Sequence, residues 1–128
     1  MTRKRKGPPE AQGSDDVDLR FLLMVDATSE DEVKNTLRTV FPDVPWRKSH
    51  SFDVKGNWAE VWLNDLHDPI KARDPKSGFV FYRYRVEFSP IGTPPTMDGQ
   101  VALATKIRDA FRATSTPVTV CSNFEDRL

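Results

Sequence analysis

Residues 78–88 read Gly78-Phe79-Val80-Phe81-Tyr82-Arg83-Tyr84-Arg85-Val86-Glu87-Phe88, and they separate into two unlike faces when read with the two-residue period of a β-strand. One face carries Val80, Tyr82, Tyr84, Val86 and Phe88. The other carries Phe79, Phe81, Arg83, Arg85 and Glu87. Aromatic rings mixed with guanidinium groups suit neither a dry core nor an ordinary solvated surface. We therefore expect a strand whose second face meets a partner.

The residues that precede this stretch predict a strand followed by a helix. Residues 19–25 alternate with apolar side chains on both faces, which is typical of a central strand. Ser29 and Glu32 have the spacing of a capping box, and an apolar stripe with helical spacing follows them. Pro42 ends the predicted helix because it lacks a backbone N–H.

Residues 51–63 alternate as one further strand, with a bend or bulge at Gly56-Asn57. The polar residues 64–78 contain two prolines and predict a long loop between two antiparallel strands. After the strand at 79–88, Asp98 is expected to cap a helix that runs to about residue 113. Residues 117–121 are β-branched and predict a final strand.

The predicted order is strand, helix, strand, strand, helix, strand. This is the split βαβ arrangement of ferredoxin-like domains, so we expect an α+β fold with a four-stranded antiparallel sheet and two helices on one face. If residues such as Ala59, Val61, Leu63, Val80 and Tyr84 point toward the helices, the uncovered side carries an aromatic and basic set. That set is Trp58, Trp62, Phe79, Phe81, Arg83 and Arg85.

Length and composition restrict the domain organisation and the location of the protein. The chain has 128 residues, with 19 basic and 19 acidic side chains, so no global field attracts nucleic acid or an anionic membrane. Residues 1–16 have the composition of a disordered basic arm, with Arg3, Lys4, Arg5 and Lys6, and residues 17–128 are expected to form a single α+β domain. A single cysteine and no apolar leader or membrane span predict a cytoplasmic protein.

Binding rather than catalysis is the predicted function. Trp, Tyr, Phe and Arg are enriched at the centres of protein interfaces, and Glu60 and Glu87 are available for ion pairs across such an interface. The expected partner is a second copy of the chain, as a homodimer, or a specific protein that this chain serves as an inhibitor, adaptor or subunit. A third interpretation is that the loop at 64–77 or the C-terminal tail folds over the aromatic residues and makes them part of the core.

Single-stranded RNA or DNA is the alternative partner. Aromatic side chains on the sheet can stack on bases while Arg83 and Arg85 meet phosphates, and the basic arm can add contacts. Residues 77–84 resemble the strand-three signature of RNA-recognition motifs, although Ser77 occupies the place of a basic residue. The zero net charge opposes this alternative.

The residues that could perform chemistry favour ordinary structural roles. Asp65, His67 and Asp68 lie close together in the sequence and could bind a metal or transfer protons, but the Asp68-Pro69 dipeptide is also typical turn chemistry. Cys121 alternates with β-branched residues, as a buried structural cysteine does. We therefore predict no catalytic residue, no metal and no cofactor.

Overall fold

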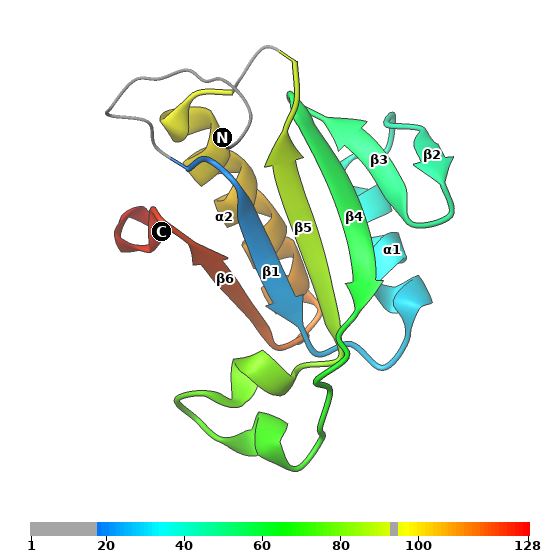
Figure 1. The fold of residues 1–128 in the computed structure, drawn as a ribbon. Helices are drawn as coiled ribbons and strands as arrows, with labels where there is room; N and C mark the ends of the chain where they lie inside the picture. Colours follow the sequence, from blue (N-terminus) through cyan, green and yellow to red (C-terminus); the bar gives the residue numbers. More distant parts are fainter. Residues whose placement is uncertain (1–17, 93–94) are drawn as a thin grey trace, which may run out of the picture.

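The structure, a computed structural model, describes residues 18–92 and 95–128 (Figure 1). The predicted arm at 1–16 lies outside the described residues. In chain order the elements are β1 (Phe21–Val25), α1 (Glu30–Val40), β2 (Trp46–Lys48), β3 (Ser51–Val54), β4 (Asn57–Leu63), the 3-10 turns η2 (Lys71–Arg73) and η3 (Gly78–Phe81), β5 (Tyr84–Pro90), α2 (Met97–Ala113), β6 (Val118–Ser122) and the 3-10 turn η4 (Glu125–Arg127).

The six strands form one antiparallel sheet in the order β2-β3-β4-β5-β1-β6, and both helices lie against the same face of it (Figure 1). The α+β class is confirmed. The expectation of a four-stranded ferredoxin-like sheet is wrong, because β2 and β3 extend the sheet beyond β4.

One of the two extra strands arises because the chain forms a hairpin where the sequence predicts a bend or bulge. Lys55 and Gly56 both have positive φ, at 49° and 82°, and they form a two-residue turn between Val54 and Asn57, which pair with each other. Turns of this kind match the twist of antiparallel strands. Residues 51–63 are therefore two strands, and the other extra strand is β2, which pairs with β3.

The strand predicted at 79–88 begins later, at Tyr84. Residues 78–81 form the turn η3, and the carbonyl groups of Val80 and Tyr82 accept hydrogen bonds from Asn64 Nδ2 at 2.8 and 2.7 Å. These bonds from a buried side-chain amide take the place of the backbone hydrogen bonds that a strand would make here. The alternating pattern of residues 79–83 does not reveal this competition.

The core lies between the sheet and the two helices. From the sheet it takes apolar residues of β1, β4 and β5, including Leu23, Val25 and Phe88, which are fully buried. From α1 it takes the buried side chains of Val33 and Leu37, which lie on the apolar face of the helix. The helical residues of α2 that complete the core are Leu103, Ala104, Ile107 and Phe111.

The N-terminal cap of α1 agrees with the sequence-based prediction, and the cap of α2 does not. The Ser29 hydroxyl accepts a hydrogen bond from the Glu32 N–H at 3.2 Å, as the capping-box spacing predicts. The cap of α2 is Thr96, whose hydroxyl accepts from the Gly99 N–H at 2.9 Å, and not Asp98. Asp98 lies in the first turn of α2, where it pairs with Arg127.

Candidate functional site

We call the side of the sheet opposite α1 and α2 the outer face. Cross-strand partners in an antiparallel sheet project to the same side, so the register shows which residues share this face. Trp62 is opposite Arg85, which is opposite Met24. Glu60 is opposite Glu87, and Glu87 is opposite Leu22 on β1. The outer face carries Leu22, Met24, Trp58, Glu60, Trp62, Arg85 and Glu87.

The structure brings together three of the six residues that the sequence analysis selected. Trp58, Trp62 and Arg85 lie on the outer face. Phe79 and Phe81 do not, because both belong to η3 rather than to a strand, and the ammonium group of Lys71 lies 5.3 Å from the centre of the Phe81 ring. The prediction that these two phenylalanines share a sheet face with Arg83 and Arg85 is therefore wrong.

Arg83 lies just before β5 and is tied to the connection between β1 and α1. Its backbone N–H donates to Asp26 Oδ1 at 3.2 Å, and its Nη1 donates to the carbonyl oxygen of Thr28 at 3.1 Å. The guanidinium group therefore fastens the end of the sheet to the start of α1. It is part of the scaffold beside the outer face.

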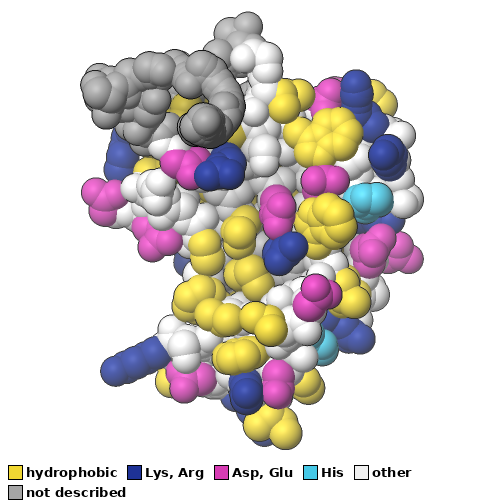
Figure 2. All heavy atoms as spheres, viewed as in Figure 1, with side chains coloured by type: hydrophobic (Ala, Val, Ile, Leu, Met, Phe, Trp, Pro, Cys, Tyr) yellow, Lys and Arg dark blue, Asp and Glu magenta, His cyan; other side chains and the backbone are white. Residues whose placement is uncertain are grey.

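The centre of the outer face is acidic. Glu60 and Glu87 are direct cross-strand neighbours, and Arg85 Nε lies 2.7 Å from Glu87 Oε2 in an ion pair without hydrogen-bond geometry. Within residues 18–92 and 95–128, Glu60 has no ion-pair partner. Figure 2 shows acidic side chains between hydrophobic ones on this face. The pairing of these two glutamates cannot be derived from the sequence, because the register between strands is set by tertiary structure.

The two tryptophans flank this acidic centre along β4. Trp62 is 39% exposed, and its ring centre lies 5.7 Å from that of His50. Trp58 is half-buried, and the guanidinium carbon of Arg47 lies 5.5 Å from the centre of its ring. Each indole therefore has one neighbour on the sheet and still presents part of its surface to solvent.

Exposed apolar side chains gather at one end of β4 and in residues 64–83, which we call the 64–83 segment. Five of the six large hydrophobic residues that are exposed in the described part of the chain lie between positions 62 and 80. These five are Trp62, Leu63, Leu66, Ile70 and Val80. The sequence predicts that Leu63 and Val80 point toward the helices. Both side chains are instead exposed, so that prediction is wrong.

The 64–83 segment projects beyond the end of the sheet (Figure 1). It does not fold across the outer face, so the interpretation in which it buries the tryptophans is wrong. Asn64 holds its two ends together, since its Oδ1 accepts from the Leu66 N–H and its Nδ2 bonds the carbonyls near η3. The segment is a structured lobe beside the outer face.

The titratable residues of the 64–83 segment stabilise its turns. Asp68 Oδ1 accepts from the backbone N–H groups of Ile70 and Lys71, and the Lys71 bond is the main reason why the pKa of Asp68 is lowered. Asp74 is held in the same way by Ser77 and Lys76, and its pKa is lowered by these bonds. In the described residues, no group of three His, Cys, Asp or Glu side chains has an arrangement that could hold a metal ion.

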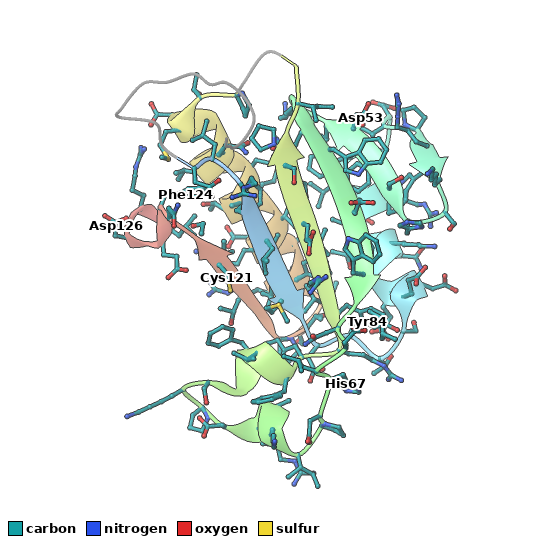
Figure 3. The ribbon with its side chains drawn as sticks, viewed as in Figure 1. Asp53, His67, Tyr84, Cys121, Phe124 and Asp126 are labelled. Atoms are coloured by element: carbon teal, nitrogen blue, oxygen red, sulfur yellow. The ribbon has the colours of Figure 1, made fainter. Side chains whose placement is uncertain are left out.

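Cys121 lies on β6, away from His67 (Figure 3). Burial raises the pKa of its thiol, and the nearby Glu125 carboxylate raises it further. A thiol with a raised pKa forms little of the thiolate that acts as a nucleophile at neutral pH.

Comparison of the chain with protein families, curated proteins and solved structures finds no match. Among the helices of the described residues, none combines the length and the apolar character that crossing a membrane requires.

Proposed function

We propose that this protein is a non-enzymatic binding module that docks against another protein through the outer face and the adjoining 64–83 segment. The observation that carries the proposal is the concentration of exposed apolar side chains between Trp62 and Val80. Contiguous exposed apolar surface marks sites of interaction, whereas single exposed hydrophobic residues are ordinary.

The composition and connectivity of this region support the proposal. Trp and Arg are the residue types that most often dominate binding energy at interfaces, and Trp58, Trp62 and Arg85 lie together on the outer face. The connection between β4 and β5 is much longer than the 2–5 residues usual between paired antiparallel strands, and long structured connections frequently carry function. We infer that the lobe and the outer face contribute to one contact area.

Single-stranded nucleic acid is a weaker candidate on the same face. Bases stacked on Trp58 and Trp62 would carry their phosphates past Glu60 and Glu87, and carboxylates repel phosphates. A second copy of the chain, stacked sheet to sheet, would likewise bring the acidic centre of one copy close to that of the other. A different protein is therefore the favoured partner.

The test uses Trp62→Glu, with Ile91→Glu as the matched control because Ile91 is an exposed large hydrophobic residue outside the group at positions 62–80. The solution mass is measured by light scattering at two protein concentrations, and proteins captured by each variant are then purified and titrated individually. We expect at least one purified protein to bind the wild type and Ile91→Glu with equal affinity and Trp62→Glu about tenfold or more weakly. A monomeric chain with no partner whose titrated affinity depends on Trp62 would overturn the proposal.

A further inference from the structure

We propose that the outer face recognises a lysine- or arginine-bearing segment of its partner, with the cation held between Trp58 and Trp62 over the carboxylates of Glu60 and Glu87. This inference rests on the proposed function and specifies the chemistry of the partner.

The spacing along β4 suits a single cationic side chain. Trp58, Glu60 and Trp62 alternate on one side of the strand, so the two indoles stand about 13 Å apart at their Cα atoms with the carboxylate midway. Glu87 lies opposite Glu60, at about 5 Å between Cα atoms. A cation midway along the row stands about 6.5 Å along the strand from each tryptophan and beside both carboxylates, so an indole that leans toward it comes within the roughly 6 Å of a cation–π contact.

The charges at the centre favour an added cation. Like charges directly opposite each other destabilise a sheet, and Glu60 and Glu87 are such a pair. Arg85 compensates Glu87, with its Nε 2.7 Å from Oε2, but no described basic residue pairs with Glu60. One more positive charge would complete the pairing of the two carboxylates.

Two unsatisfied polar atoms lie beside the same carboxylates. Ser51 is opposite Glu60 on β3 and is fully buried, and its hydroxyl has no hydrogen-bond partner among the described residues. Arg85 Nε is also buried, and its 2.7 Å contact with Glu87 Oε2 lacks hydrogen-bond geometry. Buried polar atoms are normally hydrogen-bonded, so the hydrogen bonding beside these carboxylates is incomplete within the described chain.

The open shape of the face favours a side chain on a polypeptide over a small free cation. Beyond Trp62 the chain enters the 64–83 segment, whose exposed Leu66 can contact residues flanking the cation. Figure 2 shows hydrophobic side chains extending from the acidic centre toward the lobe. The aliphatic stems of lysine and arginine also pack well against indole rings.

The test measures binding of a fluorescein-labelled hexalysine peptide to the full chain at low ionic strength, with hexaglutamate as the reference peptide. The variants are the double substitution Glu60→Gln with Glu87→Gln, Trp62→Leu, and the control Asp126→Asn, which removes an exposed carboxylate from η4. We expect the glutamine double variant to bind hexalysine about tenfold or more weakly, Trp62→Leu about threefold or more weakly, and Asp126→Asn with no change.

A second readout separates binding from folding. Glu60→Gln removes a like-charge pair, so its melting temperature should equal or exceed that of the wild type while its affinity for hexalysine falls. Equal weakening by Asp126→Asn, or equal binding of hexaglutamate, would overturn the inference. So would a self-association that depends on Trp62, because a second copy would then occupy the face. If hexalysine fails to bind but a Trp62-dependent protein partner is found, this inference fails and the proposed function stands.

Discussion

Asn57 and Gln100 form a buried pair of side-chain amides that sequence patterns do not indicate. Neither residue is exposed to solvent. Asn57 Nδ2 donates to Gln100 Oε1 at 2.9 Å, and Gln100 Nε2 donates to Asn57 Oδ1 at 2.8 Å and to the Leu19 carbonyl at 2.9 Å. The pair joins the β3–β4 turn to α2 and to the chain entering β1.

Replacing either amide by alanine should destabilise the protein, because the remaining amide would be buried without a partner. We expect Asn57→Ala and Gln100→Ala each to lower the free energy of unfolding by about 1–3 kcal/mol. The double variant should cost less than the sum, since neither amide is then left unpaired. Urea denaturation of the three variants measures this difference, and additive losses would contradict the assigned pair.

At the scale of elements, the 64–83 segment depends on local hydrogen bonds and on one close backbone approach. A Cβ atom at Gly78 would lie 2.3 Å from the carbonyl oxygen of Ala72, so η2 and η3 pack together only because residue 78 has no side chain. The sequence places Gly78 at the end of a predicted loop, just before the predicted strand at 79–88. Its contact is with a residue of the same loop, and no periodicity reveals that contact.

Gly78→Ala should therefore loosen the lobe. We expect a loss of about 1–3 kcal/mol in the free energy of unfolding, because the opposing atom is backbone and η2 must move away. Lys76→Ala, at an exposed position nearby, is the control and should change stability by less than about 0.5 kcal/mol. Thermal unfolding followed by circular dichroism compares the two, and a stable Gly78→Ala would show that the approach is not required.

The turns of the same segment should loosen in acid. The pKa values of Asp68 and Asp74 are lowered from their ordinary value of 3.8 by backbone N–H donors. A carboxyl whose pKa is lower in the folded state stabilises above its ordinary pKa and loses that contribution as pH falls through the folded value. Amide resonances of Lys71 and Ser77 should therefore shift below about pH 4 while those of α2 stay in place. Unchanged segment resonances down to about pH 2.5 would contradict this role.

At the scale of the whole molecule, one core connects the sheet with both helices. The buried cluster includes residues of β1, β3, β4, β5, β6, α1 and α2. Phe21 stacks on Phe88 with ring centres 4.6 Å apart, and Phe124 of the C-terminal residues packs edge-on against Phe21. A single shared core predicts that these elements unfold together.

Unfolding should accordingly be a single cooperative transition. Tryptophan fluorescence and far-ultraviolet circular dichroism should report the same urea midpoint. Leu23→Ala, at a fully buried position of a central strand, should lower the free energy of unfolding by about 2–5 kcal/mol with either probe. Two separate midpoints, or a loss seen by only one probe, would show that the elements do not share one core.

The sequence by itself determined the features that depend on residues close together along the chain. The stripe of α1 and its Ser29 cap, the central position of β1 and the inward direction of Ala59, Val61 and Val86 all follow from local periodicity and capping chemistry. Trp58, Trp62 and Arg85 also share the predicted face, because alternation within a strand is a local property.

Only the tertiary structure decided the features that depend on distant partners. Asn64 donates hydrogen bonds to the carbonyl groups of Val80 and Tyr82, so Phe79 and Phe81 lie in η3 and not in a strand. The turn at Lys55-Gly56 converts an expected bulge into a hairpin and so adds one strand, and the pairing of β2 with β3 adds another. The register of β4 against β5 places Glu60 opposite Glu87. Each outcome depends on which hydrogen-bonding group is nearest after folding, and that is a property of the packed chain rather than of any local pattern.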